Sequence, residues 1–316
     1  MQTLSILHPL AALILSPLLP GIINRTKAYF AGRKGQPLLQ AYYDLARLFQ
    51  KTPVYSRTTT WIFRAGPLVG LASAITALLV LPLGGGTAMF SFTGDLIYLI
   101  YLLGVMRFFT VVAALDTGSA FEGMGASREV QFSVLAEPAL LLSLLAMGEI
   151  GEIALVAGVP ESLPRLSLSG IYTSLSFSVW MHSGTILLLA ASALLIVLLT
   201  ESSRIPVDDP TTHLELTMIH EVMVLDHSGP DFAMILYGAA IKLWIFSALL
   251  TGVLIPVRSG NFLLDGTATL GGIFLLAIVI GVIESSMARL RLMRIPQLLS
   301  GAGVLAILAL VLVLKG

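Results

Sequence analysis

The 316-residue chain contains no cysteine, and only 11% of its residues are charged. Without cysteine it can form no disulfide, no thiolate-ligated iron–sulfur cluster and no cysteine-type zinc site. Soluble domains carry about 25% charged residues, whereas 56% of this chain is hydrophobic and its net charge is zero. We therefore expect a membrane protein that does not bind nucleic acid.

Apolar runs long enough to cross a bilayer recur along the whole chain. A helix needs about 20 apolar residues to span the hydrocarbon core. The sequence contains about eight such runs, at roughly 4–24, 62–82, 95–114, 131–150, 178–200, 232–255, 268–288 and 296–314. We predict an all-α fold, a polytopic transmembrane bundle of about eight helices that forms a single integral membrane domain over residues 1–316.

Basic residues are distributed unevenly between the two sides of this bundle. If the runs thread the membrane in turn, 13 of the 18 Lys and Arg residues fall on one side and 3 on the other. The positive-inside rule places the side with 13 basic residues in the cytoplasm. Both termini then lie outside the cytoplasm, and we expect the protein in the inner (plasma) membrane of the cell. The predicted cytoplasmic loops then cover about 25–61, 115–130, 201–231 and 289–295.

The first cytoplasmic loop contains an amphipathic stretch over residues 38–51. Leu38, Tyr42, Leu45 and Phe49 recur at helical spacing, and basic residues flank them. This pattern predicts a helix that lies at the membrane interface or against a neighbour. Two interpretations stay open at this point: the helix only orients the chain in the membrane, or it is a docking platform for a peripheral partner.

Ionisable residues within or at the edge of apolar runs are the most informative feature. They are Glu137, Glu201, Lys242 and Glu284. A charge at bilayer depth costs at least about 2.5–3.5 kcal/mol, so their presence predicts a protein-lined, hydrated path for protons or ions. Pro138 removes a backbone hydrogen bond and can open room for water beside Glu137. The alternatives are a structural role for Glu137, and pairing of Glu284 near the cytoplasmic end of its run.

Residues 201–231 form the most polar segment after the first loop. Arg204 lies three residues after Glu201, so the two can pair if the helix continues that far. Prolines at 206 and 210 predict an irregular backbone, followed by a short helix that begins at Asp208 or Thr211 and ends at Gly229-Pro230. Within that helix Glu215, His220 and Glu221 could face the bundle.

Three histidines in this segment are spaced by seven residues, at 213, 220 and 227. On one helix they would span about 21 Å, which is too far for one metal ion. We therefore predict no metal site and favour histidines that handle protons or donate hydrogen bonds near the carboxylates.

Several short motifs, in this order, resemble the complex I subunit 1 superfamily. That superfamily includes the membrane subunits of group 4 energy-converting nickel–iron hydrogenases and of formate hydrogenlyase, and the hydrogenase branch is the more similar. The resemblance runs nearly end to end. The motifs are Gly32-Arg33-Lys34-Gly35-Gln36-Pro37, Arg107-Phe-Phe, Leu115-Asp-Thr-Gly-Ser119, Gly125-Ala-Ser-Arg-Glu129, Glu137-Pro138, Glu201-x-x-Arg204-x-Pro206-x-Asp208 and Glu284-Ser-Ser-Met-Ala-Arg289.

The resemblance implies a subunit without a redox centre of its own, which joins a cytoplasmic redox arm to antiporter-like membrane subunits. Iron–sulfur and nickel–iron centres are then expected in the partners, and this chain would supply part of a buried proton path. The path residues implied or inferred are Glu137, Glu201, Glu215, Glu221, Lys242, Glu284 and His220. The expected redox-arm interface comprises Arg33, Lys34, Asp44, Lys51, Asp116, Arg128, Glu129, Arg204 and Asp208.

The chain departs from the family pattern at Gln36 and after Asp208, where the usual acidic series is replaced. The second departure speaks against a standard quinone chamber. A quinone-reducing complex I subunit, an independent secondary transporter and a passive anchor for the redox arm remain as alternatives.

Overall fold

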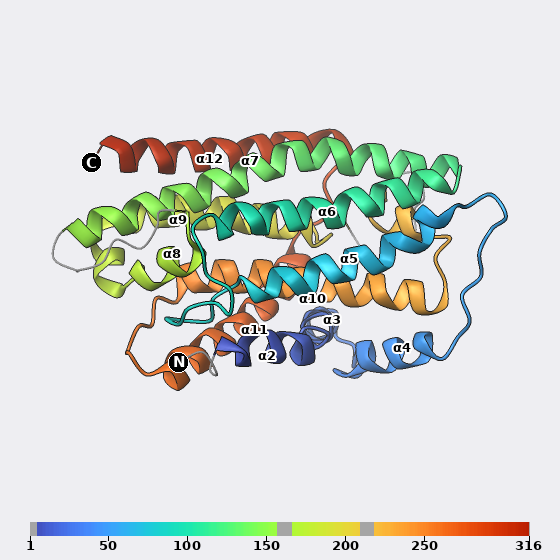
Figure 1. The fold of residues 1–316 in the computed structure, drawn as a ribbon, viewed down its shortest axis with the longest axis horizontal. Helices are drawn as coiled ribbons and strands as arrows, with labels where there is room; N and C mark the ends of the chain where they lie inside the picture. The colour runs from blue at the N-terminus through green and yellow to red at the C-terminus, as the bar shows by residue number, and fades with distance from the viewer. Residues whose placement is uncertain (1–4, 157–165, 209–217, 316) are drawn as a thin grey trace.

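The computed structural model describes residues 5–156, 166–208 and 218–315, and these residues are helical or irregular, with no strand. Within these described residues, seven helices are long and apolar enough to cross a membrane, or eight if a bent pair near the N-terminus counts as one span. The predicted all-α bundle is confirmed, and the chain is a multi-pass membrane protein. Most of the long helices lie roughly along the long axis of the molecule (Figure 1).

The spans follow one another along the chain, with the longest connections between α3 and α5 and between α9 and α10. The bent pair is α2 (Leu7–Leu15) with α3 (Leu18–Phe30). The others are α5 (Trp61–Leu79), α6 (Asp95–Asp116), α7 (Ala120–Val156), α9 (Phe177–Glu201), α10 (Gly229–Leu254), α11 (Phe262–Ser286) and α12 (Ile295–Lys315). Shorter elements are α4 (Gln40–Phe49), α8 (Leu168–Ser174) and the 3₁₀ turns η1 (Glu221–Val224) and η2 (Leu292–Arg294).

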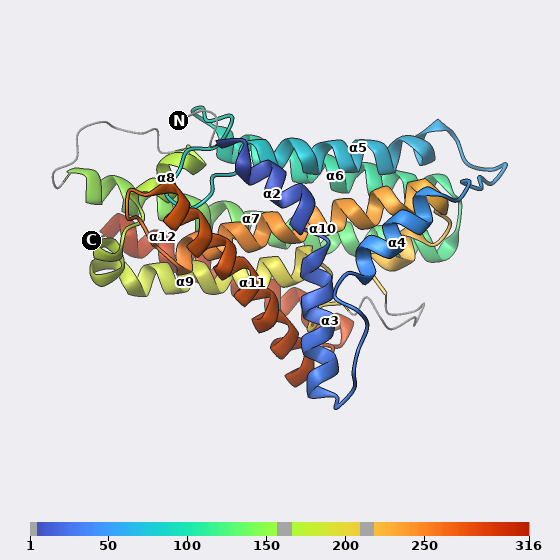
Figure 2. The ribbon, with the colours of Figure 1, turned by 90° about the horizontal axis from the view of Figure 1, so that it is seen from below.

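Helix α10 is the most buried span and packs against α5, α9 and α11, while α7 packs against α6, α9 and α12. Trp244, near the middle of α10, is fully buried. Figure 2 shows α3 and α11 projecting from one side of this bundle. The hydrophobic core thus surrounds α10 and brings α6, α7, α9 and α10 together around one interior region.

The first span is bent by 45°, where we expected one continuous run. Pro17 has no N–H to donate to the carbonyl of Leu13, so the helix loses that hydrogen bond. The Tyr237 hydroxyl of α10 donates to Leu13 O instead, at 2.7 Å, and the Tyr42 hydroxyl of α4 donates to Ile14 O. Two tyrosines therefore satisfy the carbonyls that the bend exposes.

Helix α7 is much longer than the predicted run at 131–150. Its 37 residues correspond to about 55 Å, well beyond the roughly 30 Å of a hydrocarbon core. Residues 120–130, expected as a loop, are its first turns, so Arg128 and Glu129 stand on a helix. The helix continues through Pro138, and Glu137 lies near its middle.

Two further expectations concern the surface segments. The amphipathic helix of the first loop is present as α4, with no buried residue and with Tyr43 and Phe49 exposed. The prediction of a short helix between Asp208 and Gly229-Pro230 is wrong for residues 218–228, where the structure has only the 3₁₀ turn η1. Gly229 and Pro230 begin α10 instead, since proline is favoured in the first helical turn, where its missing N–H costs nothing.

Candidate functional site

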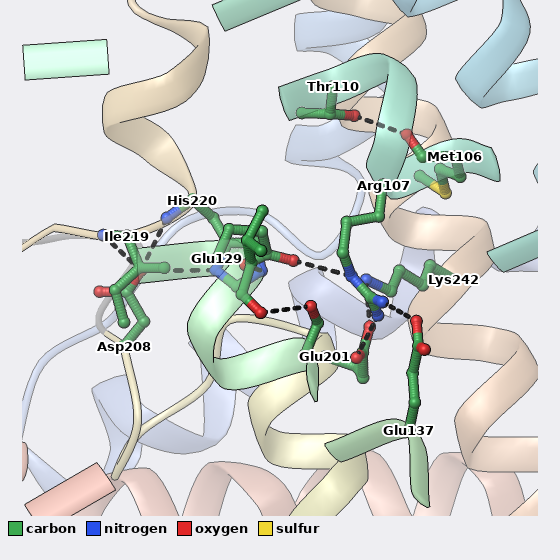
Figure 3. Close-up of polar contacts among 12 residues, drawn as sticks. Met106, Arg107, Thr110, Glu129, Glu137, Glu201, Asp208, Ile219, His220 and Lys242 are labelled. Atoms are coloured by element: carbon green, nitrogen blue, oxygen red, sulfur yellow. Dashed lines mark hydrogen bonds and ion pairs between the residues drawn. The ribbon is translucent and has the colours of Figure 1, made fainter. Parts of the chain in front are cut away.

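Arg107 of α6 lies at the centre of a buried group of carboxylates (Figure 3). Its Nε is 3.2 Å from Glu129 Oε1. Its Nη1 pairs with Glu137, and its Nη2 pairs with Glu201. The planar guanidinium presents five N–H donors in a fixed fork, which allows one cation to hold three carboxylates from α7 and α9 together.

Lys242 of α10 extends this group in the interior of the bundle. Its Nζ lies 2.6 Å from Glu201 Oε2, and both side chains are buried. Glu201 is the last residue of α9, so the end of that helix delivers its carboxylate between the two cations. The Lys242 ammonium has the anionic partner that a charge at this depth requires.

His220 and Asp208 continue the group towards the 202–228 connection. His220 Nε2 is 2.9 Å from Glu129 Oε2, and its Nδ1 is 3.7 Å from Asp208 Oδ2. Asp208 Oδ2 also accepts hydrogen bonds from the backbone N–H groups of Ile219 and His220, both at 3.2 Å. Arg289, in the connection between α11 and α12, donates to Asp208 Oδ1 at 2.8 Å.

The electrostatics of this connection favour charged forms on both sides. Burial alone disfavours the imidazolium, but the carboxylates of Glu129 and Asp208 raise the pKa of His220 to about 9. Burial alone raises the pKa of Asp208, but His220 and Arg289 lower it below its ordinary value. With His220 protonated, its charge and those of Arg107, Lys242 and Arg289 balance the four carboxylates at 129, 137, 201 and 208.

These residues form one unbroken series of ion pairs, which we call the ion-pair chain. It begins at Arg289, in the connection between α11 and α12, and enters the bundle through Asp208, His220, Glu129, Arg107, Glu201 and Lys242, with Glu137 as a branch at Arg107. The branch is different from the rest, since 43% of the Glu137 side chain is exposed. A charged carboxylate that faces lipid within the membrane is costly.

Glu284 belongs to a second, smaller group. Its Oε2 is 2.8 Å from Lys27 Nζ, its Oε1 is 3.5 Å from Arg204 Nη1, and its side chain is fully buried. Two pairings that the sequence left open are therefore not formed. Arg204 does not pair with Glu201, because α9 ends at Glu201, and Glu284 pairs with Lys27 instead of Arg289 or the membrane surface.

The predicted path residues are thus only partly brought together. Glu137, Glu201, His220 and Lys242 belong to the ion-pair chain. Glu284 is in the second group, and Glu221 begins η1, half-buried. Glu215 lies outside the described residues.

The predicted redox-arm interface divides into exposed and buried residues. Arg33, Lys34 and Lys51 are exposed, and the half-buried Asp44 accepts from Gln40 Nε2 at 2.8 Å. In contrast, Glu129, Arg204 and Asp208 are buried. These three lie inside the protein because opposite charges from other elements neutralise them there.

Asp116 and Arg128, also predicted for the interface, hold neighbouring segments in place. Asp116, at the end of α6, accepts from the Thr60 N–H and hydroxyl at 2.6 and 2.9 Å, just before α5 begins. Arg128 Nη1 donates to Met218 O at 2.8 Å. Both tie a connection to a long helix.

Sequence reasoning missed the roles of Arg107 and Lys27. Arg107 was visible as an arginine inside an apolar run and as part of a family motif, which is the signal that could have found it. Lys27 had no such signal, because it stands among the basic residues of the first loop and only the packing of α3 against α11 brings it to Glu284.

Comparison with known proteins gives three findings. A family model described as NADH dehydrogenase matches residues 1–315. Formate hydrogenlyase subunit 4 of Escherichia coli is 30% identical over 305 residues, covering 93% of this chain and 94% of the relative. Hydrogenase-4 component C of the same organism is 31% identical over 289 residues, covering 90% and 86%.

The fold also has a solved counterpart. A chain of the membrane-bound sulfane sulfur reductase, an archaeal respiratory membrane complex, superposes with a TM-score of 0.77 at 20% identity, covering 98% of both chains. At that identity the match bears on the fold alone.

Proposed function

Because this chain belongs to the NADH dehydrogenase family, whose members include complex I subunit 1, we propose that it is the membrane subunit of a multisubunit, ion-translocating oxidoreductase of the hydrogenase or formate hydrogenlyase type. Two relatives from E. coli are named as a formate hydrogenlyase subunit and a hydrogenase component, and this chain covers 94% and 86% of them. In this proposal the chain docks a cytoplasmic redox arm and provides part of a buried proton path.

The ion-pair chain is the single observation that carries this proposal. It joins the 202–228 connection to an ammonium inside the bundle, and alternating carboxylates and cations lie between them. A purely structural anchor gains nothing from this arrangement, because burying ion pairs costs desolvation energy that apolar packing avoids.

The arrangement suggests how a charge change at one end reaches the other. Loss of the His220 proton leaves Arg107 as the cation paired with Glu129. The guanidinium then moves closer to Glu129 and weakens its hold on Glu137 and Glu201. A carboxylate that loses a nearby cation binds a proton more readily, so a proton enters the branch at Glu137 or the Lys242 end.

Glu137 is the proposed exit from this subunit. Its half-exposed carboxylate needs a polar partner at membrane depth, and a neighbouring antiporter-like membrane subunit would supply one. At the opposite, cytoplasmic end, Arg33, Lys34 and Lys51 with the exposed face of α4 form the proposed docking surface for the redox arm. The termini are then outside, and the iron–sulfur and nickel–iron centres lie in the partner subunits.

Coupling in proteoliposomes tests the path. Replacing Glu137→Gln removes the proton-accepting group with little change in shape, so the complex should assemble and turn over but pump with greatly reduced yield per electron. Glu122→Gln is the matched control, since Glu122 is a buried carboxylate in the first turn of the same helix and lies outside the ion-pair chain. Full pumping by the Glu137 variant would contradict the proposed path.

A further inference from the structure

A small cavity lies between α5, α6 and α10, beside His227 near the end of the 202–228 connection. Its volume is about 20 Å³, and one water molecule needs about 10–15 Å³ of such space. Among the described residues, the polar side chains that line it are those of His227 and Thr110, and neither belongs to the ion-pair chain. The rest of the lining is apolar or glycine.

The cavity exists because glycines of α5 stand where the three helices meet. Gly66 and Gly70 both line it. A Cβ at Gly66 would lie 2.9 Å from the side chain of Ala113, so the missing side chain lets α5 and α6 approach closely. A Cβ at Gly70 would meet only Met106 Cγ, at 3.7 Å. The junction is therefore tightly packed at residue 66 and roomier at residue 70.

His227 is held in a fixed orientation at the edge of this cavity. Its imidazole stacks on Phe63 of α5, with ring centroids 3.9 Å apart and planes 8° apart, and the residue is buried. Nδ1 is enclosed and has no hydrogen-bond partner among the described residues. The ring nitrogen that can face the cavity is therefore Nε2.

The position of the imidazole proton follows from this enclosure. Burial lowers the pKa of His227 to about 4, so the ring is neutral at physiological pH and carries one proton. On Nδ1 that proton would be enclosed without an acceptor, and a buried donor without an acceptor is unfavourable. The proton is therefore on Nε2, and an acceptor in the cavity would satisfy it.

Thr110 of α6 offers a second polar group to the same cavity. Its hydroxyl donates to Met106 O at 2.9 Å (Figure 3), so its own proton is used and its oxygen can still accept. A buried water needs at least two polar partners. One water that accepts from His227 and donates to Thr110 has them.

We propose that this cavity binds one water molecule, which accepts from His227 Nε2–H and donates to Thr110 Oγ1. The volume admits nothing larger, and the N–H that faces the cavity repels a cation. The water joins the 202–228 connection to α6 at a point three residues from Arg107. This site rests on the cavity alone, so it can fail while the proposed function stands.

A high-resolution map of the purified complex tests the site directly. At a resolution that shows other buried waters, cryo-electron microscopy should show one isolated density within hydrogen-bond distance, about 2.7–3.2 Å, of both His227 Nε2 and Thr110 Oγ1. A cavity without density, or one filled by the Met106 side chain, would overturn the proposal.

Filling the cavity gives a second measurement with a matched control. Gly70→Ala adds a methyl group to the cavity wall at an ordinary contact distance from Met106, so the variant should fold and lose the water density. Gly184→Ala adds the same group to α9, 3.6 Å from Trp180 and away from the cavity, and should keep the density. Retention in both variants, or loss in both, would contradict the site.

Nuclear magnetic resonance tests the hydrogen bond itself. The difference between ¹⁵N-histidine spectra of the wild-type complex and of His227→Phe isolates the His227 ring, because phenylalanine preserves the stacking on Phe63. The ring should be neutral with its proton on Nε2, and this proton should exchange magnetisation with bound water in Gly184→Ala but not in Gly70→Ala. A proton on Nδ1, or equal water contact in both glycine variants, would overturn the assignment.

Discussion

Arg107 and its three carboxylates concentrate the chemistry of the molecule in a few side chains. Each carboxylate comes from a different position, on α7 at residues 129 and 137 and on α9 at residue 201. A single point charge could not satisfy all three in fixed geometry, whereas the guanidinium fork can. Arginine therefore serves here both as counter-charge and as a geometric template.

Substitutions at Arg107 should separate these two roles. Arg107→Met leaves three carboxylates in the bundle with one cation fewer and should destabilise the protein by about 3–5 kcal/mol. Arg107→Lys keeps the charge but loses the fork, so the complex should assemble with a smaller stability loss and still pump poorly. Thermal unfolding of the purified complex and proteoliposome pumping measure the two effects; equal behaviour of both variants would contradict this separation.

His220 should make stability depend on pH in a defined window. Its pKa in the folded protein is about 9, above the ordinary 6.5, so protonated His220 stabilises the fold fully below about pH 6.5. That contribution is lost as pH rises towards 9. The unfolding midpoint of the wild type should fall over this range.

The matched comparison for this pH window is His220→Gln, which carries no titrating group. It should unfold at a lower temperature than the wild type at pH 6 and converge with it near pH 10. Parallel curves for the two proteins across the range would show that His220 is not the group responsible.

At the scale of elements, the position of His220 depends on how η1 packs on α7. Gly125 faces this segment so closely that an added Cβ would collide with Val222 and lie 2.9 Å from Ile219 O. Four residues on, Glu129 lies on the same face of α7 and pairs with His220. The missing side chain at 125 is therefore what lets the 218–224 segment reach the carboxylate.

Gly125→Ala should push the 218–224 segment away from α7. Overpacking of this kind costs about 1–3 kcal/mol, and the displaced His220 should lose its pairing and its pH-dependent stabilisation. Gly123→Ala is the control on the same helix, because a Cβ there meets only Leu115 at 4.0 Å. Stability curves against pH compare the two; an unchanged curve for the Gly125 variant would contradict this packing role.

The bent first span shows a second element-scale dependence. Tyr42 of α4 and Tyr237 of α10 bond to adjacent carbonyls at the bend. The surface helix proposed to dock the redox arm is thus tied to α10, which carries Lys242. The two tyrosine partners are distant from the bend along the chain and could not be read from the sequence.

At the scale of the whole molecule, the proposal requires partners. Purification from mild detergent should bring soluble redox proteins along with this chain, among them a nickel–iron large subunit, and mass spectrometry identifies them. A flavin-containing NADH module or bound quinone would instead indicate a complex I subunit. Recovery of the chain alone, with transport activity, would indicate a secondary transporter and contradict the proposal.

The sequence determined the fold class, because hydropathy sets which segments enter the bilayer. It also determined that charge is buried, because each ionisable residue stands out within an otherwise apolar run. Periodicity also located α4, whereas the extent of α7 was missed because its polar first turns lie outside the apolar run.

Only the tertiary structure decided which charges meet. The pairs of Arg107 with Glu201, Lys27 with Glu284 and Arg289 with Asp208 join residues 94, 257 and 81 positions apart, counted from their sequence numbers. Coulomb attraction depends on the distance between charges in space and not on their separation along the chain, so helix packing selects the partner of each charge.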